Sequence, residues 1–150
     1  VLNYYNYIRW VHNAPALTVD RDLENSAGYW AQYVANHPAP SCLYHNQLGG
    51  QNIYFAWQER EMSEYDLAHA TIKAFYSEQK FYDYSRPNFN HAASHFTNLI
   101  WKATRRVGIS VYWKYFYNQH GGCHVQGYPS RPLLGYMVVI NEWPRGNTMT

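Results

Sequence analysis

The sequence has little charge, little cysteine and no long apolar run. Only 15% of its 150 residues are charged, and 12 basic residues against 10 acidic ones give a formal net charge of +2. No run of Lys or Arg appears, so nucleic acid is a poor candidate for a ligand, because binding phosphates requires clustered cations. No apolar stretch reaches the length of about 18 residues that a membrane-spanning helix requires.

The two cysteines, Cys42 and Cys123, are compatible with one disulfide bond or with two free thiols. A bond between them would close a long loop and stabilise the fold by about 4 kcal/mol as an upper estimate. Composition does not choose between the two states, since the choice depends on the redox compartment. The sequence also has no Asn-x-Ser/Thr sequon, so N-glycosylation gives no information about location.

Apolar and aromatic residues are abundant. Apolar residues make up 47% of the chain and aromatic residues 19%, including 16 tyrosines. This composition and length predict one domain over residues 1–150 with a real hydrophobic core. From the patterns alone, the fold class is a mixture of helices and strands.

Three segments have the spacing of helices, namely residues 2–12, 20–34 and 63–80. Asp20 is a good N-cap for the second, and Ser63 with Asp66 approximates a capping box for the third. Glu78 falls near the end of the third segment, where an acid opposes the helix dipole, so we expect a local partner for it. The second segment carries an apolar stripe of Leu23, Ala27, Trp30, Ala31 and Val34.

Strands are predicted from the period-two pattern that begins at Val107, and over residues 53–57 and 133–140. The last segment can pair with the strand from Val107.

The run SHFTNLIWKAT, residues 94–104, combines a histidine with an apolar helical face of Phe96, Leu99 and Ile100. His95 and Asn98 fall beside that face, and Ser94 can cap the start of the helix. The run predicts a short helix that presents His95 to a cleft and then leads into a strand.

SHFTNLIWKAT resembles the signature of the CAP superfamily of cysteine-rich secretory, antigen 5 and pathogenesis-related 1 proteins, with Ser94 in place of Gly and Asn98 in place of Gln. Other segments match in order: His12-Asn13, the helix from LTVDRDLENSAGYWAQYVA, Gln51-Asn52, FYSE with YDYSRPNF, and the final PRGN at residues 144–147. The resemblance covers nearly the whole chain. It implies an α+β fold, a three-layer α-β-α sandwich with a central antiparallel sheet, as a single CAP domain over residues 1–150. The shortage of cysteines resembles the Golgi-associated and yeast-type branches.

The resemblance also implies a central cleft of four residues, which in this chain are His45, Gln51, Glu78 and His95. His45 and His95 would be candidate ligands for Zn²⁺ or another divalent cation, with Glu78 as a third ligand or as the partner of a ligating histidine. Gln51 replaces an acid, which removes a negative charge and should weaken metal binding. An equally open interpretation is a buried polar cluster that holds helix to sheet.

A hydrolase is a further alternative, since Ser94, His95 and Glu78 contain the residue types of a catalytic triad. Neither a nucleophile elbow nor a His-Glu-x-x-His motif is present, and adjacent Ser and His on a helix point in different directions. We therefore expect no enzymatic activity, no catalytic residues and no required cofactor.

Several branches of the family bind sterols or fatty acids, so the resemblance implies a lipid ligand in an apolar groove. Two groups of residues are candidates for its lining: Tyr33, Pro38, Pro40, Leu43 and Tyr44, which surround the loop near His45, and a second aromatic group of Tyr76, Phe81, Tyr82 and Phe89. Core packing is the plainer explanation for any single one of them.

A protein receptor is the alternative partner, through exposed aromatics such as those of residues 114–117. The family resemblance and a possible Cys42–Cys123 bond favour secretion, and a cytoplasmic, membrane-associated protein is the alternative.

Overall fold

The computed structural model of the chain describes residues 1–37, 43–46, 50–116 and 133–148. Within these residues the helices are α1 (Leu2–Val11), α2 (Arg21–Asn36), α3 (Glu64–Tyr76) and α4 (Ser94–Leu99), with the 3₁₀ turns η1 (Ser77–Phe81) and η2 (His91–Ala93). The strands are β1 (Thr18–Val19), β2 (Gln51–Gln58), β3 (Arg106–Phe116) and β4 (Leu133–Trp143). No helix in this part of the chain is long and apolar enough to cross a membrane.

The four strands form one sheet in the order β1-β3-β4-β2. Its three long strands are antiparallel, as predicted, and Ile140 of the central strand β4 lies between Ile109 of β3 and Asn52 of β2. The sequence did not predict β1, which adds two residues parallel to the start of β3. Two residues are too few to show a periodic pattern.

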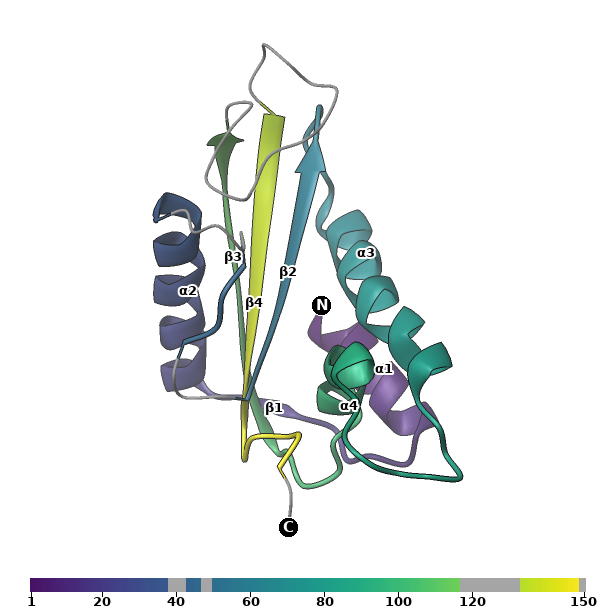
Figure 1. Cartoon of the computed structure of the whole chain (residues 1–150). Coiled ribbons are helices and arrows are strands. Elements are labelled where there is room, and N and C mark those ends of the chain that lie inside the picture. Colours follow the sequence, from purple (N-terminus) through teal and green to yellow (C-terminus); the bar gives the residue numbers. More distant parts are fainter. Residues whose placement is uncertain (38–42, 47–49, 117–132, 149–150) are drawn as a thin grey trace.

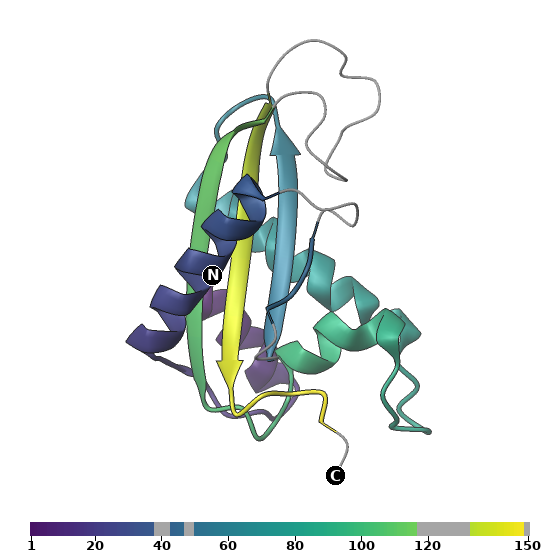
Figure 2. The ribbon, with the colours of Figure 1, turned by 60° about the vertical axis from the view of Figure 1, so that its left-hand side comes forward.

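Helices cover both faces of the sheet, so the predicted three-layer α-β-α sandwich is confirmed. Figures 1 and 2 show α2 alone on one face and α1, α3 and α4 together on the other. Each face has its own apolar core: Ala27, Ala31 and Val34 of α2 pack on Val139, and Phe75 of α3 belongs to the core of the opposite face. Alternate residues of β4 supply the two cores, as the period-two pattern requires.

The ends of the helices differ in part from the predictions. Asp20 and Ser63 cap α2 and α3 as expected, the Asp20 carboxylate accepting from the backbone N–H of Asp22 at 2.9 Å. The helix predicted over residues 63–80 is too long, because α3 ends at Tyr76 and Glu78 lies in η1. The prediction that Ser94 caps its helix is wrong, since η2 leads directly into α4 and the Ser94 side chain makes no capping bond.

Gly108 sets the distance between α2 and the sheet. A Cβ atom at this position would lie 2.1 Å from the backbone of Leu23 and Glu24. The helix can therefore rest directly on β3 only because residue 108 has no side chain.

Arg9 fixes the opposite layer. Its buried guanidinium donates to the carbonyl oxygens of Leu99, Trp101 and Thr104 at 2.8–3.0 Å, and its Nε donates to Pro15 O at 2.7 Å. One side chain of α1 thus binds carbonyl groups at the end of α4 and in the turn that follows it. This holds the run 94–104 in place.

Candidate functional site

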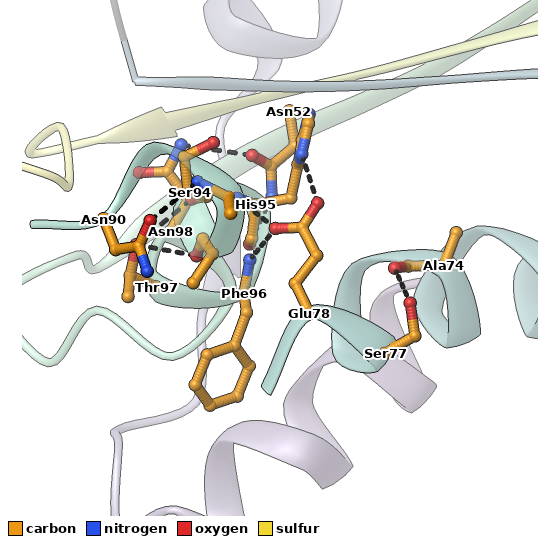
Figure 3. Close-up of polar contacts among 12 residues, drawn as sticks. Asn52, Ala74, Ser77, Glu78, Asn90, Ser94, His95, Phe96, Thr97 and Asn98 are labelled. Carbon is orange, nitrogen blue, oxygen red and sulfur yellow. Dashed lines mark hydrogen bonds and ion pairs between the residues drawn. The ribbon is translucent and has the colours of Figure 1, made fainter. Parts of the chain in front are cut away.

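Glu78 and His95 form a closed polar unit between η1 and α4 (Figure 3). One carboxylate oxygen of Glu78 accepts from the backbone N–H groups of His95 and Phe96 at 2.9 and 3.2 Å. The other lies 2.8 Å from Nδ1 of His95. The ring of His95 also stacks on Phe75, with centroids 5.2 Å apart and planes within 4°. Both polar ends of the carboxylate are therefore occupied.

This geometry explains the acid that seemed misplaced at a helix end. Because α3 stops at Tyr76, the Glu78 side chain faces the first turn of α4 and not the dipole of its own helix. A carboxylate that accepts backbone N–H groups at the start of a helix stabilises that helix.

Amide side chains extend this unit into the sheet. Asn52 of β2 donates to the carbonyl oxygen of His95 at 3.1 Å, and Asn98 donates to Asn52 Oδ1 at 3.1 Å. On the outer side of α4, Asn147 donates to Ser94 O at 2.9 Å and accepts from the Thr97 hydroxyl at 2.5 Å. Helix α4 is thus bound to β2 on one side and to the C-terminal segment on the other.

The hydrolase interpretation finds no support in this arrangement. The described residues include no hydrogen bond between the Ser94 hydroxyl and the His95 ring, whose Nδ1 faces Glu78. Adjacent serine and histidine therefore do not form a nucleophile and base.

His45 and Gln51 form a second, more open unit. Gln51 Oε1 lies 3.0 Å from His45 Nδ1 and accepts from the Asn46 backbone at 3.3 Å, while its Nε2 donates to Asn141 Oδ1 at 2.8 Å. Asn141 donates in turn to Leu23 O of α2 at 3.4 Å. This chain of amides fixes the orientation of Gln51, so His45 Nδ1 is the donor to it. Gln51 is buried and His45 is exposed.

The four residues of the predicted cleft therefore divide into two pairs. Gln51 shares a sheet face with Asn141 and α2, whereas its neighbour Asn52 points to the face of α4 and His95. No group of three or more His, Cys, Asp or Glu side chains in the described ranges is placed to hold a metal ion. These donors fall short of the three-ligand set of a divalent centre, so metal binding by His45 and His95 stays a prediction.

Three adjoining cavities lie along α4 and the C-terminal segment. The first, of about 330 Å³, is lined by Tyr82, Pro87, Asn88, Phe89, Thr97, Trp101, Asn147 and Thr148. A second, of about 480 Å³, shares Tyr82, Thr97, Trp101 and Thr148 with it and adds Ile100, Lys102 and Ala103. We call these two cavities together the aromatic groove. A third, of about 450 Å³, shares Phe89, Asn147 and Thr148 with the first and is otherwise lined by His45, Gly50, Gln51, Asn98, Arg145 and Gly146.

The predicted lipid-binding residues occupy different places. Tyr82 and Phe89 line the aromatic groove. Tyr76 instead packs against the rings of His12 and Phe96, and Phe81 is exposed with Lys80 Nζ 5.1 Å from its ring centroid.

The other predicted group lies against α2. Tyr33 stacks on Trp30 with centroids 5.2 Å apart, and Leu43 and Tyr44 pack on the core of that face. These contacts suit packing better than a ligand surface. Pro38 and Pro40 lie outside the described residues, as do Cys42 and Cys123.

A buried carboxyl group lies beneath the cleft. Tyr5 donates to Glu142 Oε1, and burial raises the pKa of Glu142 to about 8, against the smaller opposing effects of Tyr5 and Arg9. Burial likewise raises the pKa of the Tyr5 hydroxyl well above its usual range. At neutral pH Glu142 is therefore mainly protonated and adds little negative charge to the region.

Sequence reasoning missed several residues of the site. Trp101 was counted only as part of the central run, and Arg145 only as a spacer in PRGN. Asn141 carried no local signal, because its role depends on the register between β4 and β2. Arg9 was detectable in principle as a lone cation within an aromatic helix.

The fold and the site together define a CAP-type sandwich. The model of the cysteine-rich secretory protein (CAP) family matches residues 2–139, so the chain belongs to this family.

Relatives and solved structures agree with this assignment. The chain is 27% identical over 111 residues to the human Golgi-associated plant pathogenesis-related protein 1, a match that covers 73% of this chain and 68% of that protein. It is 28% identical over 111 residues to fruiting body protein SC14 of Schizophyllum commune, covering 74% of this chain and 46% of the relative. The hookworm platelet inhibitor shares the fold with a TM-score of 0.59 at 15% identity, over 98% of this chain and 66% of that one. NaASP2, solved with Zn²⁺, has a TM-score of 0.57 at 20% identity, over 91% and 64% of the two chains.

Proposed function

We propose that this protein is a non-enzymatic binding protein that holds a sterol, fatty acid or other lipid in the aromatic groove. The observation that carries this proposal is the lining by Tyr82, Phe89 and Trp101, two of which were candidates from the sequence. Phe89 is 53% exposed although it is a large apolar side chain, and it borders the groove. A ligand that covered it would remove this surface from water.

The size and stiffness of the groove support an elongated apolar ligand. Its two cavities, of about 330 and 480 Å³, are in the range of small-molecule sites. The backbone of Trp101 is held by the bond from Arg9 to its carbonyl oxygen at 2.8 Å, so the chain that carries this side chain is fixed before binding. Each methylene moved from water into the groove contributes about 0.8 kcal/mol, part of which offsets the entropy lost on association.

Native mass spectrometry with an added sterol and with a twelve-carbon alcohol tests this proposal. We expect a one-to-one adduct with at least one of them, and at least tenfold weaker binding in Trp101→Ala. A folded chain that binds neither would overturn the lipid proposal.

Phe81→Ser is the matched control for Phe89→Ser, because both residues are about half exposed and only Phe89 lines the groove. We expect Phe89→Ser to weaken binding and Phe81→Ser to leave it unchanged. Equal loss in both variants would mean that the ligand lies elsewhere.

Recognition of a protein is the second candidate function. Trp10 is 73% exposed and stacks with the exposed Tyr7 on α1, and Trp113 and Tyr115 are exposed on β3. Exposed aromatics of this kind are enriched at protein interfaces. This function would be favoured if the wild-type protein binds no lipid but does bind a receptor, and if Trp10→Ser abolishes the binding to that receptor.

Secretion is the location that we propose, supported by membership of the secretory family, with a cytoplasmic, membrane-associated protein as the alternative. Fractionation of cells that make the full-length protein tests it: recovery from the medium supports secretion, and recovery with membranes supports the alternative.

A further inference from the structure

The cavity lined by His45 and Arg145 has a positively charged wall, whereas a cation site needs negatively charged ligands. No carboxylate is among its lining residues, which are His45, Gly50, Gln51, Phe89, Asn98, Arg145, Gly146, Asn147 and Thr148. The guanidinium of Arg145 has no ion pair or hydrogen bond within the part of the chain that the structure describes. We propose that this cavity binds an oxyanion, a carboxylate or a phosphate, through Arg145.

The loss of the acid at position 51 is the first support for this inference. The Gln51 oxygen is occupied by His45 and the Asn46 backbone, and its nitrogen by Asn141. Gln51 therefore brings no negative charge and no free oxygen toward a divalent cation. The carboxylate of Glu78 is likewise taken up by α4 and His95.

Close packing of two glycines places Arg145 at the wall of the cavity. Gly50 has a φ of +62°, and a Cβ there would lie 2.7 Å from the Cβ of Arg145. A Cβ on Gly146 would lie 2.6 Å from Asn98 Oδ1. The segment that carries Arg145 is therefore packed against the start of β2 and against α4, which limits its freedom before a ligand arrives.

Among the described residues, no carboxylate forms an ion pair with Arg145. Glu142, three residues before it, is buried and mainly protonated at neutral pH. A guanidinium without a competing carboxylate is well suited to bidentate binding of a carboxylate or phosphate.

The cavity also adjoins the aromatic groove, since Phe89, Asn147 and Thr148 line both. An oxyanion bound at Arg145 can therefore be the head of a lipid whose chain lies over Phe89 and Trp101, or a free small anion. The lipid form of the inference rests on the proposed function, and the free-anion form does not.

Calorimetry with four probes separates these forms: dodecanoate, dodecanol, acetate and inorganic phosphate. We expect dodecanoate to bind at least tenfold more tightly than dodecanol, and Arg145→Ala to remove that difference while the affinity for dodecanol is unchanged. Arg60→Ala is the matched control, since Arg60 is an exposed cation beyond the opposite end of β2. It should change neither affinity.

Each result decides between the proposals. Equal binding of dodecanoate and dodecanol, unaffected by Arg145→Ala, would overturn the oxyanion site and leave the lipid groove standing. Binding of acetate or phosphate that Arg145→Ala abolishes, without binding of dodecanol, would support the oxyanion site and count against the groove. Loss of dodecanoate affinity in Arg60→Ala as large as in Arg145→Ala would reduce the effect to net charge and overturn the site. Binding of none of the four probes would overturn the oxyanion site, and the absence of a sterol adduct as well would overturn the lipid groove.

Discussion

The two halves of the cleft contain similar residues and do different things. In one half Glu78 and His95 bond to each other and to the backbone of α4, and their side chains are 20% and 33% exposed. In the other half Gln51 is held by Asn141, and His45 and Arg145 border an open cavity. The first pair stabilises the fold, and the second has capacity left for a ligand. A histidine and an acid that match a family motif can therefore be structural, even beside a cavity that we propose binds a ligand.

The largest expected effect comes from lifting α2 off the sheet with Gly108→Ala. The added Cβ would meet the backbone of Leu23 and Glu24 at 2.1 Å, and moving the helix away breaks the bond that Asn141 donates to Leu23 O. We expect a loss of about 3 kcal/mol or more, which urea unfolding measures.

Gly28→Ala is the control at the same contact between helix and strand. Its Cβ would meet only the Ser110 hydroxyl, at 3.1 Å, which can rotate away. Alanine is favoured over glycine in a helix by about 1 kcal/mol, so this variant should equal or exceed the wild type in stability. Equal stability of Gly108→Ala and wild type would contradict the close approach of α2.

Glu78→Ala tests the closed half directly. It removes two backbone N–H partners at the start of α4 and the partner of His95, so we expect a loss of about 2–3 kcal/mol in urea unfolding. His45→Ala in the open half should cost less than about 0.5 kcal/mol, as an exposed substitution does. A similar loss in both variants would remove the contrast between the halves.

The buried carboxyl group of Glu142, beneath the cleft, makes the stability of the fold depend on pH. The folded chain keeps a proton on Glu142 up to about pH 8, whereas an ordinary glutamate releases it near pH 4.5. The unfolded chain thus binds fewer protons between these values. The free energy of unfolding should therefore fall as pH rises from about 4.5 to about 8, by at most about 1.4 kcal/mol per pH unit.

Glu142→Gln should flatten this slope, as measured by urea unfolding at pH 5, 6, 7 and 8. The two proteins differ only at residue 142, so the difference in slope isolates that residue. Identical slopes would show that the carboxyl group is ionised in the folded protein.

The smallest effect is expected from Gln51→Glu, which restores an acid to the open half. The new carboxylate lies beside His45 and should tighten binding of Zn²⁺ about tenfold, equivalent to about 1.4 kcal/mol, and weaken binding of dodecanoate. Calorimetry with each ligand measures both. Unchanged affinity for both ligands would mean that charge at position 51 does not control the cavity.

Local sequence patterns predicted most of the fold. The stripe from Leu23 to Val34, the caps at Asp20 and Ser63, and the alternation after Val107 all correspond to observed elements. The failures concern contacts that a local pattern does not contain. The helical pattern continues past Tyr76, but the chain there enters η1, where Glu78 accepts from the backbone of His95 and Phe96, 17 and 18 positions away.

The sequence by itself determined the family, the layers and the residue types of the cleft, because periodicity and motifs are properties of neighbouring residues. Only the tertiary structure decided which of these residues already have hydrogen-bond partners. The register of β2 on β4 places Gln51 beside Asn141 and directs Asn52 toward α4. The turn after α3 places Glu78 at the first turn of α4. A hydrogen-bonding group that already has its partners has little left for a ligand, and those partners come from distant parts of the chain.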